Sequence, residues 1–402
     1  MAEDPRQLET RLTPESYDKV VRRTFARARK HDRLHRKQVN RAEKGVQLLL
    51  DGGYSRFVEK WPERWWNLTG YQALLAGAQK VIFDDPREAA RMAGIAYAIS
   101  CNLSCDEYGK ELVHDFQARA AAEYANALRA GDRLAEAETQ LARAFDLARR
   151  GTGSPWLEAH ILFLSASLHG AQRRFDEAYV ALNSAFALFM ELGDRHCAGK
   201  ALIKKALYAH YHGHSEVAAK ENRAGLELID PAEEPRLVVL ARYNQAEFLS
   251  ASGQFGEAER HLFEFRREIE ASLGRVEKTK LAWLEARIDA GLGRFAGAER
   301  RILGARDAFA ELGMRFHAGV MGLELALLLL RQGRTAEAAA FASEAELVFQ
   351  QLQIQREMLA AVATLAECLR RKLATPAMVE EVISCMVKAE QSPGDRSEAR
   401  RA

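Results

Sequence analysis

The spacing of two cysteines in this chain raises the question of a metal site. Cys101 and Cys105 lie one helical turn apart, and His114 follows nearby. Thiolates and imidazoles bind zinc, but a zinc site needs about four ligands, and no second cysteine pair accompanies the first. The other cysteines are Cys197, Cys368 and Cys385, which makes an odd total without paired spacing. We therefore expect reduced cysteines that are buried as small apolar side chains.

A second candidate for metal binding is the alternating set His210, His212 and His214, which ends at a turn around Gly213. Alternate residues at a helix end point in different directions, so a polar turn is the better interpretation than a transition-metal site. The sequence has no phosphate-binding loop, Gly-x-Ser-x-Gly elbow, His-Glu-x-x-His pair or dinucleotide fingerprint. We expect a binding protein without catalytic residues, metal or cofactor.

Basic residues are concentrated near the N-terminus, where electrostatic binding is the chemistry to consider. From Lys19 to Lys44 there are eleven Lys or Arg residues, and the only acids are Asp32 and Glu43. One interpretation is a cationic arm for an acidic protein or for phosphates, and the other is a solvated helix whose arginines pair with acidic residues of the body. The candidate contacts for an anionic partner are Arg22, Arg23, Arg29, Lys30, Arg33, Arg36 and Lys37.

Aromatic residues follow this basic segment. Trp61, Trp65 and Trp66 are three of the five tryptophans and fall within six residues. Exposed tryptophans anchor protein interfaces, whereas a repeat array also needs an atypical unit to close its open end. We favour the cap, and the interface stays open.

The elements that position these residues are revealed by alanines at a fixed interval. The spacing is 41 once and 40 five times in the column Ala125, Ala166, Ala206, Ala246, Ala286, Ala326 and Ala366. A second column runs twelve residues behind it, at Ala137, Ala178, Ala218, Ala258, Ala298 and Ala338. Two columns in step at this period predict stacked repeats.

Each repeat is expected to contain two antiparallel helices. The first carries its column alanine in an apolar pattern and ends at a glycine turn such as Gly253 or Gly293. The second has apolar residues at helical spacing, for example Phe255, Ala258 and Leu262. Small residues let the two backbones approach closely, so the expected fold is an all-α solenoid of helix pairs.

At this point the residues resemble the tetratricopeptide repeat family. Its motif has a small residue in the first helix, an alanine twelve residues later and another alanine seven residues after that. In this sequence the last of these three positions is occupied by Ala144, Ala185, Gly225, Phe265, Ala305 and Ala345. The resemblance covers roughly residues 70 to 390, with a period near 40 instead of 34. It implies a right-handed superhelical solenoid, here with a basic helical N-terminal extension. Such long repeats look like those of bacterial regulatory and scaffold proteins.

The resemblance also implies which residues bind a partner. In the family, fixed positions around the first alanine column line the concave groove. Transferred to this sequence, the groove contains the cationic, amide and aromatic residues Arg119, Asn126, Arg129, Phe163, Lys200, Tyr243, Lys280, Trp283 and Arg287. At its C-terminal end the same positions give Leu323, Leu327 and Leu330, for which groove and inter-repeat core are equally good interpretations.

Composition and boundaries agree with a soluble helical protein. Lys plus Arg total 58 against 56 Asp plus Glu, so the net charge of +2 does not by itself indicate a nucleic-acid partner. The start lacks an apolar core for export, and we expect a cytoplasmic location. The predicted domains are a flexible 1–12, a basic helical region and aromatic cap at 13–83, the repeat array at 84–390 and a disordered tail at 391–402.

Three functions follow as hypotheses. The first is a non-enzymatic scaffold or adaptor of bacterial signalling, transcriptional control or stress and defence regulation, which holds an acidic and apolar segment of a regulatory protein in its groove. The second is a nucleic-acid-binding regulator that uses the basic N-terminal helix, with the repeats as a ligand-sensing or peptide-sensing module. The third, and weakest, is a sensor of peptide pheromones.

Overall fold

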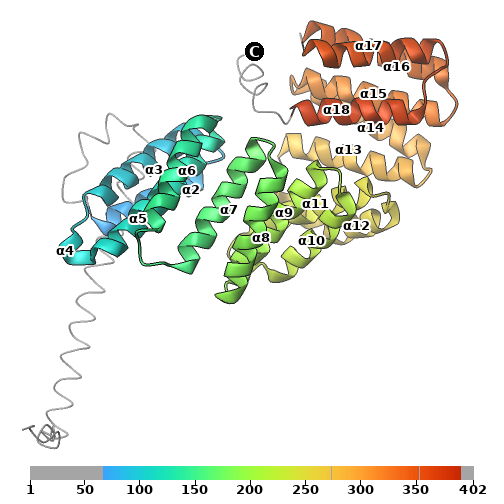
Figure 1. The fold of residues 1–402 in the computed structure, drawn as a ribbon. Coiled ribbons are helices and arrows are strands. Elements are labelled where there is room, and N and C mark those ends of the chain that lie inside the picture. The colour runs from blue at the N-terminus through green and yellow to red at the C-terminus, as the bar shows by residue number, and fades with distance from the viewer. Residues whose placement is uncertain (1–66, 273, 353, 391–402) are drawn as a thin grey trace, which may run out of the picture. The chain divides into compact units, whose positions relative to one another are not determined.

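The computed structural model describes residues 67–272, 274–352 and 354–390. All regular structure within these ranges is helical (Figure 1). The helices are α2 Leu68–Val81, α3 Pro86–Cys101, α4 Cys105–Tyr108, α5 Lys110–Ala130, α6 Leu134–Ala148, α7 Pro155–Ala171, α8 Phe175–Glu191, α9 Arg195–Tyr211, α10 Ser215–Leu228, α11 Pro235–Ala251, α12 Phe255–Ser272, α13 Arg275–Gly291, α14 Phe295–Glu311, α15 Arg315–Arg331, α16 Thr335–Gln351, α17 Arg356–Arg370 and α18 Pro376–Glu390.

The turns inside the repeats are those that the glycines predict. Gly253 and Gly293 have φ angles of 78° and 76°, a left-handed conformation that glycine adopts without steric cost. At both turns the backbone closes onto the preceding helix, with Gln254 N donating to Leu249 O at 2.9 Å and Arg294 N to Asp289 O at 2.8 Å. The first helix of each pair therefore stops, and the second starts antiparallel to it.

Both alanine columns are buried throughout the described chain. Ala125 is 3% exposed, and the other members of the two columns are fully buried. The third column is buried too, except that Phe265 is only partly buried. A methyl group at the crossing points lets neighbouring backbones approach, and the larger apolar residues beside it fill the layers. The all-α solenoid of helix pairs is confirmed.

The chain divides into two compact units, residues 1–157 and 158–402. In the described part of the first unit, α2 packs on α3, α3 on α5 and α5 on α6. Tyr71 is buried, and its hydroxyl donates to Phe116 O at 2.9 Å. The short helix α4 and the turn at Gly109, whose φ is 85°, connect α3 to α5.

In the second unit, each helix from α8 to α18 packs against the next in the chain, because a repeat cannot bury its apolar stripe alone. The last helix, α18, packs against α15 as well as against α17. Its Val379, Ile383 and Met386 join the same core cluster as Leu323 and Leu327 of α15. The chain thus closes this end of the array by folding its own last helix over a first-type helix.

Among the residues that the structure describes, no helix has both the length and the apolar character needed to cross a membrane. The predicted boundaries at residues 12, 83 and 390 stay predictions. The basic N-terminal segment, the tryptophan cluster and the C-terminal tail lie outside the described residues.

Candidate functional site

The groove residues predicted in the first unit engage one another or their neighbours. The guanidinium of Arg119 on α5 lies 5.3 Å from the ring centroid of Trp156. Asn126 Oδ1 accepts hydrogen bonds from Arg129 Nε at 3.1 Å and from Arg129 Nη2 at 3.0 Å. The geometry therefore gives these three residues intramolecular partners, and their binding role stays a prediction.

In the second unit, Phe163 of α7 meets the next first-type helix. The ammonium of Lys204 on α9 lies 3.6 Å from the centroid of the Phe163 ring, and the same group donates a hydrogen bond to Ser167 Oγ. A cation over an aromatic face is an attractive contact. Phe163 is thus a partly buried ring with a positive charge on one face.

Lys200 also lies on α9, but a carboxylate already neutralises it. Its ammonium pairs with Glu234, which precedes α11. His196 Nε2 lies 3.7 Å from the same carboxylate. An acidic partner would have to compete with Glu234 for Lys200, so the structure reduces the weight of this residue in the predicted groove.

Tyr243 on α11 is a partly buried phenol. Burial raises the pKa of Tyr243 above its usual range, with the Glu247 carboxylate acting in the same direction and Arg287 against it. The hydroxyl therefore stays protonated at neutral pH and can donate a hydrogen bond. The apolar part of the ring packs on the core that α11 shares with its neighbours.

Trp283 on α13 binds an acid that the sequence reasoning missed. Its Nε1 donates to Glu324 Oε1 on α15 at 3.1 Å, and Glu324 is only 8% exposed. Burial raises the pKa of Glu324, while Arg287, the Trp283 hydrogen bond and Arg331 oppose that rise. The available signal was a single glutamate inside the apolar run from Met321 to Leu330.

Lys280 and Arg287 complete this arrangement on α13. Both are partly buried, and neither has a hydrogen-bond or ion-pair partner within 67–272, 274–352 and 354–390. We call Tyr243, Lys280, Trp283 and Arg287 the α11–α13 row. The helices α11 and α13 touch directly, so the row places two aromatic rings and two cations on adjacent first-type helices.

The leucines at the C-terminal end of the predicted groove belong to the core. Leu323 is fully buried, Leu327 is 8% exposed, and Leu330 packs against the same cluster. Helix α18 contributes to that cluster, and Glu380 on α18 pairs with Arg331 of α15 at 2.5 Å. Of the two interpretations left open by the sequence, inter-repeat core is the one that the structure supports.

The expectation of buried cysteines is wrong for three of the five. Cys101, Cys105 and Cys385 are exposed, whereas Cys197 and Cys368 are partly buried. Cys101 ends α3 and Cys105 begins the short α4, so both lie at helix ends away from the packed layers. Burial raises the pKa of Cys197 to about 12, which keeps it a thiol at neutral pH.

The histidine segment forms the turn that its glycine predicts. Gly213 has a φ of 93°, and His210 Nδ1 lies 2.9 Å from Ser215 Oγ across that turn. His212 and His214 are exposed, with ring centroids 5.3 Å apart. No group of three or more His, Cys, Asp or Glu residues within the described ranges could hold a metal ion.

The predicted anionic-partner contacts are not described. Arg22, Arg23, Arg29, Lys30, Arg33, Arg36 and Lys37 precede residue 67, as do Trp61, Trp65 and Trp66. The role of the basic segment and the choice between a tryptophan cap and a tryptophan interface therefore stay predictions.

Comparison with solved structures shows what this fold is similar to. The apo form of the quorum sensor NprR from B. thuringiensis matches with a TM-score of 0.57 at 15% identity, over 75% of this chain and 81% of that one. A Rap protein complexed with competence and sporulation factor matches with a TM-score of 0.53 at 14% identity, over 80% of this chain and 87% of that one. NprR in complex with its cognate peptide NprX matches with a TM-score of 0.50 at 16% identity, over 75% of this chain and 84% of that one.

No protein-family model matches the sequence, and the comparison with curated proteins finds no relative. At identities this low, the structural matches establish the fold alone. The buried alanine columns, the paired helices and these neighbours together define the class: the chain has the fold of tetratricopeptide-type repeat proteins.

Proposed function

We propose that this chain is a non-enzymatic adaptor that holds an extended or helical segment of another protein on the α11–α13 row. The observation that carries the proposal is the pairing of two aromatic rings, Tyr243 and Trp283, with two cations, Lys280 and Arg287, that have no ion-pair partner in the described part of the chain. Aromatic residues and arginine dominate the binding energy of protein interfaces.

The chemistry of the row selects the kind of segment. Tyr and Trp rings offer apolar surface beside a polar tip, and Arg can bind a carboxylate through two parallel hydrogen bonds. Glu324 holds the indole N–H of Trp283, so that ring presents its apolar surface and not its donor. The preferred ligand is therefore a segment that alternates apolar and acidic side chains.

The biological setting belongs to the same proposal. We place the chain in bacterial signalling, transcriptional control or stress and defence regulation, acting from the cytoplasm, where binding sequesters a regulatory protein. A second candidate is a peptide sensor, and the observation in its favour is the structural similarity to NprR in complex with its cognate peptide. Both candidates use the same row, and they differ in whether the ligand is part of a protein or a free peptide.

The experiment is a selection of binding sequences followed by a mutational comparison. A displayed library of random peptides is selected against the full chain, and the affinities of selected peptides are measured by fluorescence anisotropy. Hot-spot residues cost about 2 kcal/mol or more on truncation, so Tyr243→Ala with Arg287→Ala is expected to weaken binding roughly 30-fold or more. Circular dichroism checks that the helices stay folded.

A matched control is Phe263→Ala with Arg267→Ala on α12. Phe263 is 85% exposed and Arg267 is exposed, and neither belongs to the row. This pair removes the same residue chemistry and should leave affinity unchanged. Equal affinity of the Tyr243/Arg287 variant and the wild type would place the interface on another surface.

A further inference from the structure

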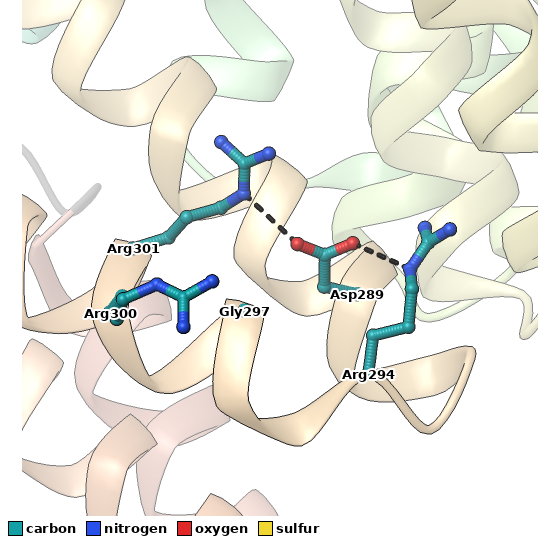
Figure 2. A pocket seen from close by; sticks show the side chains of 5 residues that line it. All are labelled: Asp289, Arg294, Gly297, Arg300 and Arg301. Atoms are coloured by element: carbon teal, nitrogen blue, oxygen red, sulfur yellow. Dashed lines mark hydrogen bonds and ion pairs between the residues drawn. The ribbon is translucent and has the colours of Figure 1, made fainter.

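A basic hollow lies between α13 and α14, and none of its residues belongs to the predicted groove. It has a volume of about 560 Å³ and is lined by Asp289, Arg294, Gly297, Arg300 and Arg301. Figure 2 shows Arg294 and Arg301 reaching Asp289 from two sides, while Arg300 extends beside Gly297. The hollow therefore has three guanidinium groups around one carboxylate.

The repeat register shows that two substitutions open this space. Forty residues before and after Asp289 stand Leu249 and Leu329, which are 2% and 0% exposed. Asp289 thus replaces a buried leucine of the helix-pair interface. A shorter, charged side chain at this position removes apolar contact and requires cationic partners, because a half-buried carboxylate without them is costly.

Gly297 is the second departure. Four other repeats have glutamate at this position, Glu136, Glu177, Glu257 and Glu337, and the repeat of α10 has Val217. At Glu136, Glu177 and Glu337 an arginine three residues earlier pairs with the glutamate, as Arg334 does with Glu337 at 2.6 Å. In α14 the glutamate is missing, so Arg294 binds Asp289 instead, with Nε 2.9 Å from Oδ1.

Two arginines of α14 also differ from the residues at the same positions of the following repeat. Arg300 and Arg301 occupy the register of Ala340 and Phe341. Relative to the following repeat, four positions therefore differ, with aspartate, glycine, arginine and arginine in place of leucine, glutamate, alanine and phenylalanine, while the preceding repeat shares the first arginine as Arg260. A repeat needs none of these changes to stack, since α15 and α16 pack without them.

Ion pairs neutralise two of the three guanidinium groups that line the hollow. Arg301 Nε lies 2.9 Å from Asp289 Oδ2, and its Nη1 lies 2.9 Å from Glu285 Oε2. Glu259 pairs with Arg294 at 2.5 Å, and Glu285 pairs also with Arg266 at 2.8 Å. Arg266 also pairs with Glu270 at 2.8 Å, so the network without Arg300 holds three guanidinium groups and four carboxylates, and Arg300 balances it.

Arg300 is the third arginine of the lining. It is exposed and has no hydrogen-bond or ion-pair partner among the residues that the structure describes. Its guanidinium lies beside the space that the missing side chain of Gly297 leaves, as Figure 2 shows. An anion entering this space meets unpaired N–H donors of Arg300 and the remaining donors of Arg294 and Arg301.

We propose that this hollow binds a single oxyanion, the phosphate or carboxylate group of a ligand. The planar fork of arginine matches both groups through paired N–H donors. Asp289 fixes two of the guanidinium groups in place, and Gly297 provides the room. The site is separate from the α11–α13 row, so it adds a second binding position to the adaptor.

The test uses the full chain with inorganic phosphate as the probe. Line broadening of the ³¹P resonance is followed during titration at constant ionic strength in chloride, and acetate is then added as a competitor. Arg300→Ala is expected to weaken phosphate binding about tenfold, since it removes a charge-assisted contact of roughly 1.5 kcal/mol. Competition by acetate identifies a site that accepts either anion, and failure to compete identifies a phosphate site.

Two further variants make the result specific. Arg260→Ala removes the arginine forty residues earlier in the same register and should leave binding unchanged. Gly297→Glu introduces the residue of four other repeats and should abolish binding, because its carboxylate would occupy the hollow. An added Cβ there lies 3.3 Å from Asp289 Oδ2, so thermal unfolding is measured alongside.

The proposal is overturned if phosphate and acetate both fail to bind saturably. It is equally overturned if Arg260→Ala weakens binding as much as Arg300→Ala, since that would show nonspecific attraction to surface arginines. Selection of peptides on the α11–α13 row is independent of this outcome, so the two proposals can fail separately.

Discussion

The close approach of α9 and α10 at two glycines supplies a sharp test of the packing. Gly225 occupies the third small-residue column, where Ala144, Ala185, Ala305 and Ala345 stand in other repeats. A Cβ added to Gly225 would lie 2.8 Å from Ile203 Cγ1 and 2.9 Å from the carbonyl oxygen of Gly199. The substitution Gly225→Ala is therefore expected to destabilise the protein, although four other repeats carry alanine at this position.

The size of the effect follows from two opposing contributions. Alanine is favoured over glycine in a helix interior by about 0.5–1 kcal/mol. Overpacking a filled interface costs roughly 1–3 kcal/mol, and here one of the two contacts is with backbone that cannot move without shifting a helix. The net change in the free energy of unfolding should be a loss of up to about 2 kcal/mol.

The control is Gly304→Ala in the middle of α14. A Cβ at Gly304 has no atom within 4 Å, so only the helix preference operates, and stability should rise by about 0.5–1 kcal/mol. Urea unfolding followed by circular dichroism compares the two variants, and hydrogen exchange at the α9 and α10 amides locates the change. If Gly225→Ala stabilises the chain as Gly304→Ala does, the two helices do not approach as described.

Other predictions concern charge, conformation and hydrogen bonding. Because burial raises the pKa of Glu324 above its ordinary value of 4.5, folding stability should fall as pH rises from 4.5 through the raised pKa, and Glu324→Gln should remove that dependence in pH-dependent denaturation. Lys372 has a φ of 57°, so Lys372→Gly should raise the melting temperature, corresponding to roughly 1 kcal/mol. Asn222 Nδ2 donates to Ala241 O at 2.9 Å and to Gln245 Oε1 at 2.8 Å, and Asn222→Ala should cost about 1–3 kcal/mol in urea unfolding. If the basic segment binds nucleic acid, the affinity measured by filter binding should fall steeply with salt and disappear on deletion of residues 1–45, while peptide binding by the repeats persists.

The fold was predictable because the alanine columns report backbone distance directly. A position such as Ala298 or Ala338 accepts only a small side chain where two helices cross, so the requirement repeats with every helix pair. The glycine turns were predictable for a related reason, since Gly253 and Gly293 have backbone conformations that other residues adopt at a cost. Both signals are local and recur, and a single sequence therefore carries them clearly.

The side-chain partners in the predicted groove were less accessible from the sequence. The pairing of Lys200 with Glu234 depends on the path of the segment before α11, which no periodicity describes. The burial of Leu323 and Leu327 depends on α18 packing across α15, a contact that breaks the repeat pattern. The exposed Cys101 and Cys105 lie at helix ends, where the general preference of cysteine for burial gives no information about position.

Glu324, the partner of Trp283 that the sequence reasoning missed, can be related to Trp283 through the repeat spacing. Phe163 contacts Lys204 and Trp283 contacts Glu324, and both pairs are 41 residues apart. The polar neighbour of a groove aromatic is therefore the residue at i+41 on the next first-type helix, not one nearby in the chain. For Tyr243 the same rule gives Leu284, which is 3% exposed and belongs to the core cluster against which Tyr243 packs, in agreement with burial as the main cause of the raised pKa of that phenol. Replacing Leu284 by arginine, which stays charged while the phenol ionises, should then set a cation against Tyr243, as Lys204 lies over Phe163, and a lowered phenol pKa in ultraviolet titration would verify the rule.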